Sequence, residues 1–270
     1  MAGAPEFALK TARLGPLPII NHFLDRLEVP SLLETFVPTV DPRARLPVAK
    51  GLGVLLRSIL VEREPIYRQH EVVHGFAPEA FGLEAGEAEA LGDDAIGRGL
   101  DRLFQADRGN LLTALVTTAI RVFGVSLKEI HNDSTSISFC GQYRSSHKGN
   151  FLRGRSAPWI TYGYSKDQRP DLKQLLYGMS TTLDGGIPIH FRCDDGNTSD
   201  TTTHWQTWTA LRDLHGSPDF LYVADSKLCT GENMDAIHNA KGRFVTVLPR
   251  TRREDHQFRP GRPLPCKPSC

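Results

Sequence analysis

The 270-residue sequence lacks the patterns of several large protein classes. No uninterrupted apolar run reaches the roughly 18 residues that a membrane-spanning helix needs. The N-terminus has no basic segment followed by an apolar one, so it does not resemble an export signal. No two cysteines have the C-x-x-C spacing that would favour a disulfide framework or a structural zinc site. We therefore expect a cytoplasmic protein without a membrane partner.

Phosphate-binding and hydrolase motifs are missing as well. The chain contains neither G-x-x-x-x-G-K-[ST] nor G-x-G-x-x-G, so nucleotide-dependent catalysis has no support. No serine lies in a G-x-S-x-G elbow, which argues against a serine hydrolase. The segment Asp194–Asp200 begins like a calcium loop but lacks the spacing and closing glutamate of an EF-hand.

Charge is balanced over the whole chain but not along it. Lysine and arginine total 32 and aspartate and glutamate 31, which gives a net charge of +1. Residues 1–125 carry 13 basic and 16 acidic side chains, whereas residues 126–270 carry 19 and 15. The sequence as a whole is not a polycation, so any nucleic-acid contact must come from local basic segments.

The spacing of apolar residues predicts a helical first half and a mixed second half. We expect helices over residues 16–29, 47–61, 94–106 and 108–123, with an exposed acidic connection over residues 83–94. We expect strands over residues 126–140, 172–183, 187–193, 220–224 and 243–248, and helices over residues 199–215 and 232–240. The alternation of strands and helices predicts an α/β fold, in which a helical N-terminal domain precedes a mixed sheet. The domains are predicted as 1–125 and 126–259, followed by a disordered tail over 260–270.

Two aspartates follow apolar strand residues and precede small polar ones. Asp133 lies in the segment His-Asn-Asp-Ser-Thr-Ser, and Asp225 lies in Val-Ala-Asp-Ser. Sheets collect ligands at the ends of neighbouring strands, and paired carboxylates suit Mg²⁺. The alternative is that both aspartates are turn or helix-cap residues.

A basic loop follows the first strand of the second half. From Tyr143 to Lys173 there are seven basic and two acidic side chains. Such a loop suits contacts with DNA phosphates, and Lys166, Arg169 and Lys173 are its candidate nucleic-acid-binding residues. A solvated loop without a partner explains the same composition.

Four segments together resemble DDE-type transposases of bacterial insertion sequences. They are His131–Ser136, Gly163–Gln174, Asp195–Asp200 with His204, and Tyr222–Ser226, within a resemblance that runs from about Leu14 to Arg259. The resemblance implies a partial RNase H-like catalytic core, in which two aspartates and a glutamate hold two Mg²⁺ (or Mn²⁺) ions. Asp133 matches the first catalytic, metal-binding aspartate and Asp225 the second.

The resemblance also implies partners. The substrate would be double-stranded DNA at the terminal inverted repeats of a transposon, which is cut and joined to a target. The N-terminal helices would bind the transposon ends, and the full-length form would be a homodimer.

The third carboxylate of the family motif Tyr-x-x-Arg-x-x-x-Glu has no match. Arg250 and Glu254 supply half of the motif, but Val247 stands at the tyrosine position and Glu254 follows Asp225 by only 29 residues. We interpret Glu254 as part of a charged segment and expect a truncated chain that is inactive in transposition. The alternatives are a non-catalytic DNA-binding remnant, which occupies transposon ends or inhibits full-length transposase, and a product that does not fold.

Overall fold

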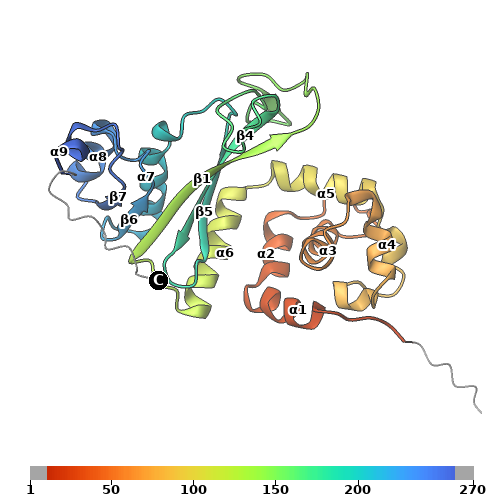
Figure 1. Ribbon diagram of the computed structural model, residues 1–270. Coiled ribbons are helices and arrows are strands. Elements are labelled where there is room, and N and C mark those ends of the chain that lie inside the picture. The colour runs from red at the N-terminus through yellow and green to blue at the C-terminus, as the bar shows by residue number, and fades with distance from the viewer. Residues whose placement is uncertain (1–10, 259–270) are drawn as a thin grey trace, which may run out of the picture. The chain divides into compact units, whose positions relative to one another are not determined.

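The computed structural model describes residues 11–258 and divides the chain into two compact units, Met1–Gly124 and Val125–Cys270 (Figure 1). The N-terminal unit is helical, and the C-terminal unit contains the main sheet. The tail expected over residues 260–270 lies outside the described residues. Within residues 11–258, no helix is both long and apolar enough to cross a membrane.

The N-terminal unit consists of α-helices joined by short 3-10 turns. The helices are α1 (Leu17–Arg26), α2 (Val29–Phe36), α3 (Val48–Val61), α4 (Gln69–His74), α5 (Asp93–Gln105) and α6 (Arg108–Phe123). The turns are η1 (Ile66–Arg68), η2 (Pro78–Phe81) and η3 (Ala88–Ala90). Helix α3 is central and contacts α1, α2, α4 and α5 (Figure 1). It takes this place because most of its residues are apolar or small, and Leu52 and Val54 are buried.

Two expectations for this unit are wrong. The helix expected over residues 16–29 is interrupted, because Glu28 adopts a left-handed conformation with φ of 57° and α2 starts at Val29. Pro30 fits the first turn of α2, where no backbone donor is needed, but it could not continue α1 without removing a hydrogen bond.

The second correction concerns the acidic stretch over residues 83–94, which is not a simple exposed connection. Its apolar residues Leu83, Ala88 and Leu91 are buried in the core. Lys50 on α3 donates to Glu84 and to Glu87, each at 2.8 Å. Apolar residues between the acids anchor the stretch, and a lysine distant in sequence neutralises part of its charge.

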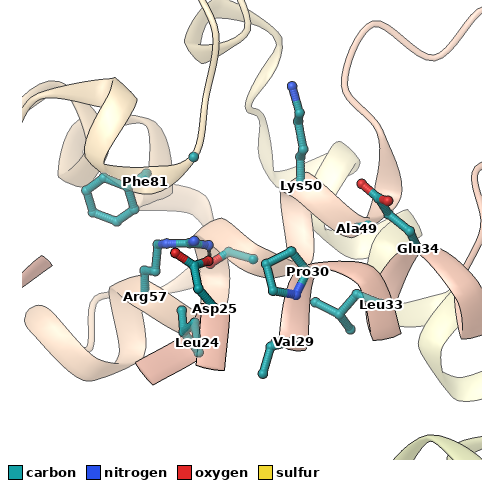
Figure 2. A pocket seen from close by; sticks show the side chains of 12 residues that line it. Leu24, Asp25, Val29, Pro30, Leu33, Glu34, Ala49, Lys50, Arg57 and Phe81 are labelled. Carbon is teal, nitrogen blue, oxygen red and sulfur yellow. Dashed lines mark hydrogen bonds between the residues drawn. The ribbon is translucent and has the colours of Figure 1, made fainter. Parts of the chain in front are cut away.

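A buried arginine links three elements of the N-terminal unit. Arg57 on α3 is 8% exposed; it donates from Nε to Asn21 Oδ1 on α1 at 2.7 Å and from Nη1 to the Gly53 carbonyl at 3.0 Å. Asn21 in turn donates to the Ala80 carbonyl of η2 at 2.8 Å. Figure 2 shows Arg57 beside Asp25 at one end of a pocket of about 260 Å³. Burial lowers the pKa of Arg57, and the Asp25 carboxylate opposes this shift.

We expect Arg57→Met to destabilise the N-terminal unit by about 2 kcal/mol, because it retains an unbranched apolar stem but leaves Asn21 Oδ1 without its charged donor. Hydrogen exchange followed by mass spectrometry should show faster exchange over residues 48–61. Arg98→Met on α5 is the control, since Arg98 is exposed. Equal exchange in the two variants would contradict the linking role of Arg57.

The C-terminal unit contains a five-stranded mixed sheet and a two-stranded hairpin. Its strands are β1 (Glu129–Phe139), β2 (Phe151–Leu152), β3 (Arg155–Ser156), β4 (Lys173–Thr182), β5 (Pro188–Asp194), β6 (Leu221–Ala224) and β7 (Arg243–Thr246). Its helices are η4 (Asp200–Thr202), α7 (His204–His215), α8 (Gly231–Asn239) and α9 (Arg253–Phe258). Each of the five strands expected from the sequence is present.

The main sheet has the order β5-β4-β1-β6-β7. Strand β4 is antiparallel to β1 and to β5, whereas β6 is parallel to β1 and to β7. This order, with a helix between β5 and β6 and another between β6 and β7, is that of an RNase H-like sheet. The predicted fold class is therefore confirmed.

Helix α7 covers one face of this sheet. Trp208 on α7 stacks on Phe220 with 6.0 Å between ring centroids, and Arg192 on β5 donates to Gln206 at 2.8 Å. Along β4 every second residue is buried, as expected for a strand with one covered face. The alternation in β1 buries Asn132, which accepts from Ser180 Oγ at 2.9 Å, and leaves Asp133 exposed.

Candidate functional site

Asp133 and Asp225 are neighbours in the register of two parallel strands. Asn132 on β1 pairs with Ala224 on β6, so the next residues along the two strands are Asp133 and Asp225. Asp133 is exposed in the middle of β1, and the Asp225 side chain, directly after β6, retains 48% of its accessible surface. The structure thus brings the two aspartates together beside the carboxyl end of β6, where sheets of this kind collect ligands. The expectation that both lie at strand ends is correct only for Asp225, because β1 continues past Asp133 to Phe139.

Hydrogen bonds to the backbone hold both aspartates. The amide of Ser134 donates to Asp133 Oδ1 at 2.7 Å, and the amide of Lys227 donates to Asp225 Oδ1 at 3.0 Å. Thr246 on β7 donates its hydroxyl to the Asp225 carbonyl at 2.6 Å. The segment after β6 is therefore fixed against β7, which limits the positions that the Asp225 carboxylate can take.

His204, the first residue of α7, lies beside Asp225. Its side chain is 4% exposed, and its Nε2 atom is 3.9 Å from Asp225 Oδ1. Its Nδ1 atom is 3.1 Å from the hydroxyl of Tyr222, a fully buried residue of β6. Burial lowers the pKa of His204 and outweighs the opposing effect of the Asp225 and Asp200 carboxylates, so the imidazole is neutral near pH 7.

Lys166 connects the basic loop to β1 and to the segment before α7. Its ammonium donates to Ser134 Oγ at 2.9 Å and to the Ser134 carbonyl, and it forms an ion pair with Asp200 at 3.0 Å. The Asp200 side chain is only 12% exposed. Protein groups therefore already engage the charge of Lys166.

Two glycines bring the basic loop and the Asp195–Asp200 segment together. A Cβ atom on Gly163 would overlap the Gly196 carbonyl, and one on Gly196 would overlap the Gln174 carbonyl. The Gln174 side chain donates to the Gly196 carbonyl at 2.8 Å. Only residues without a side chain allow the backbones to approach this closely.

The other two basic candidates also contact protein groups, and only Arg169 of the two is exposed. Arg169 is exposed and makes a two-pronged contact with Asp171, at 2.8 Å from Nε and 2.7 Å from Nη2. Lys173 donates to the Gln142 carbonyl at 2.5 Å, and its ammonium is 6.0 Å from the centre of the Tyr162 ring. Since Tyr162 is 57% exposed, this part of the loop presents an aromatic ring beside the Lys173 ammonium.

Sequence and structure comparisons give the following matches. Residues 9–117 match the family described as "Domain of unknown function (DUF4277)". No curated protein matches the chain. Among solved structures, the chain is similar to the Mos1 transposase paired-end complex with left transposon end, at 11% identity, 76% coverage of this chain, 60% coverage of that chain and a TM-score of 0.28.

Two further Mos1 structures match at the same level. The Mos1 strand transfer complex is 13% identical, with 76% of this chain and 59% of that chain covered and a TM-score of 0.27. The Mos1 mariner paired-end complex with Mn is 11% identical, with 84% and 66% covered and a TM-score of 0.28. The chain thus spans about three fifths of the length of the first of these structures.

The donor set at the two aspartates fits a hard divalent cation. Mg²⁺ usually binds through one or two carboxylates, retains several waters and takes further oxygen ligands from substrate phosphates. Asp133 and Asp225 supply two such carboxylates. Among the described residues, no group of three His, Cys, Asp or Glu side chains could hold a metal ion together.

Reasoning from the sequence missed the contacts around Asp225. The sequence places His204 and Tyr222 in two of the four segments that resemble transposases, but it does not show that their side chains meet. Neither residue has a local signal for its partner, because their contact spans 18 positions. Gly163 and Gly196 are a signal that the sequence does offer, since a glycine within an extended segment often marks a close approach of two backbones.

Proposed function

We propose that the chain is the DNA-processing part of a transposase, with Asp133 and Asp225 as its metal-binding and catalytic carboxylates. The observation that supports this function best is the pairing of β1 with β6. It puts an aspartate from each of two neighbouring parallel strands at one end of an RNase H-like sheet. The four sequence segments that resemble DDE-type transposases include both aspartates.

Within this proposal, the two carboxylates would hold Mg²⁺ or Mn²⁺. Such an ion, when bound, activates water and stabilises the oxygen that leaves a phosphodiester. The protein's own contribution is to fix the carboxylates: the Lys227 amide holds that of Asp225, and the Ser134 amide holds that of Asp133. Lys166 fixes Ser134, the neighbour of Asp133 on β1.

DNA would be held by both units. In the C-terminal unit, Arg169 and Lys173 would contact phosphates, although Arg169 also pairs with Asp171 and Lys173 donates to the Gln142 carbonyl. Lys166 would hold the loop in place through its ion pair with Asp200. We assign transposon-end binding to the N-terminal helices, and we propose that the full-length protein works as a homodimer on double-stranded DNA at its terminal inverted repeats.

The test is cleavage of supercoiled DNA that carries the ends of the element encoding this chain, with Mg²⁺ or Mn²⁺. Nicking that depends on the metal and is lost with EDTA supports the enzyme. Binding to the ends without nicking supports the second candidate, a non-catalytic protein that occupies transposon ends or inhibits the full-length enzyme. The feature that supports this candidate is the segment Val247–Glu254, in which Arg250 and Glu254 match only half of the Tyr-x-x-Arg-x-x-x-Glu motif. Binding that does not distinguish end DNA from unrelated DNA would contradict both.

Arg169→Gln should weaken DNA binding in a salt-dependent way. Loss of one phosphate contact is expected to reduce the slope of log K against log salt by about 0.9. Arg212→Gln is the matched control, because Arg212 also pairs with a neighbouring aspartate, Asp213 at 2.8 Å, but lies outside the basic loop. Fluorescence anisotropy with labelled duplex DNA at several salt concentrations gives both slopes. The same change in the two variants would exclude Arg169 as a specific phosphate contact.

A further inference from the structure

The imidazole of His204 contains a buried nitrogen without a partner. Nε2 makes no hydrogen bond among the described residues, although the His204 side chain is only 4% exposed. A buried polar atom that loses its contact with water and gains no partner is costly, so native proteins rarely keep one without a reason. The atom is directed at a carboxylate, since Asp225 Oδ1 lies 3.9 Å away.

The other ring nitrogen determines which proton His204 carries. Tyr222 is fully buried, and its hydroxyl lies 3.1 Å from His204 Nδ1. A buried tyrosine hydroxyl needs an acceptor, and the neutral imidazole has one unprotonated nitrogen. We assign the Tyr222 O–H as the donor and Nδ1 as the acceptor, which leaves the ring proton on Nε2, facing Asp225.

Of the two carboxylates near His204, Asp225 is the one that can accept the Nε2 proton. Asp200 also lies near His204, but Lys166 forms an ion pair with it at 3.0 Å and so satisfies its charge. Asp225 accepts from the Lys227 amide through Oδ1 and otherwise faces solvent. A hydrogen bond between Nε2 and Asp225 Oδ1 requires the two atoms to approach by about 1 Å from their present 3.9 Å.

We propose that Tyr222 and His204 are positioning residues for Asp225: the Tyr222 hydroxyl fixes the His204 tautomer, and Nε2–H holds one oxygen of the carboxylate while the other binds a divalent cation. The inference rests on the proposed function, because it assumes that Asp225 is a metal ligand. Residues that hydrogen-bond to a metal ligand fix its orientation, and their loss typically lowers metal affinity by about 10–100-fold.

Mn²⁺ titration of the full chain by isothermal calorimetry tests the proposal. His204→Leu removes the donor and should weaken Mn²⁺ binding by about 10–100-fold. His204→Gln retains an N–H near the position of Nε2 and should stay within about threefold of the wild type, whereas a purely structural role predicts that the two variants behave alike. Thermal unfolding of both variants separates loss of the fold from loss of the site.

Nitrogen-15 NMR of the imidazole supplies a measurement that does not depend on metal. The spectrum should show protonated Nε2 and unprotonated Nδ1, and Tyr222→Phe should shift the ring toward a mixture of tautomers. A wild-type chain that binds no Mn²⁺ would overturn the proposed function and this inference with it. A wild type that binds Mn²⁺ together with a His204→Leu variant of equal affinity, or a ring protonated on Nδ1, would overturn the positioning role alone.

Discussion

Asp225→Asn is expected to lower the affinity of the chain for Mn²⁺ by more than about 100-fold, and Asp133→Asn to do the same. Each change removes one of two anionic ligands. The loss of affinity should therefore exceed the loss of about 10–100-fold that is typical when a residue hydrogen-bonded to a ligand is changed. Asparagine retains Oδ1, and therefore keeps the hydrogen bond from Lys227 to residue 225 and from Ser134 to residue 133. The fold should survive both changes.

Isothermal calorimetry with Mn²⁺ gives the affinities, and Asp219→Asn is the control. Asp219 lies before the amino end of β6. Its substitution removes an exposed ion pair with Arg243, in which the Asp219 side chain is 83% accessible. Such pairs contribute little to stability. Equal loss of affinity in Asp219→Asn would mean that Mn²⁺ binds to general surface charge. Unchanged affinity in both Asp133→Asn and Asp225→Asn would remove the metal site from the proposal.

The sheet could be predicted from local sequence because its signals are local. The alternating apolar residues Ile187, Ile189 and Phe191 mark β5, and the turn Asp184-Gly185-Gly186 marks the hairpin, with both glycines at positive φ. In these cases, residues near in sequence carry the information. The neighbouring positions of Asp133 and Asp225 are different, because they depend on the parallel pairing of β1 with β6, which are far apart in sequence.

The parts that could not be predicted depend on partners far away in the chain. Burial of Leu83, Ala88 and Leu91 depends on packing against residues distant in sequence, and Lys50, more than 30 positions earlier, pairs with Glu84. The apolar pattern alone also does not show that the chain breaks at Glu28, where α1 has ended and α2 is about to begin. The Tyr222–His204 contact likewise requires α7 to dock on β6 before either residue has a partner.

Gly196→Ala should destabilise the C-terminal unit by more than about 4 kcal/mol, a size reserved for changes that break the packing of the backbone. The new Cβ would lie 2.6 Å from the Thr161 carbonyl and still closer to that of Gln174, inside the 3.0 Å that real Cβ atoms keep. Neither carbonyl can withdraw easily, because the two residues are paired with each other by hydrogen bonds of 2.8 and 3.3 Å.

Tryptophan fluorescence during urea unfolding measures this loss in the C-terminal unit, since Trp159, Trp205 and Trp208 are the chain's three tryptophans and all lie there. Gly231→Ala is the control: it opens α8 with no atom within 4 Å of a new Cβ and no positive φ. It should be neutral or stabilise by up to about 1 kcal/mol. An equally small effect of Gly196→Ala would show that the two segments do not cross closely. A large effect would mean that the close crossing of the two segments, whose residues Lys166 and Asp200 form an ion pair, is needed for the stability of the C-terminal unit.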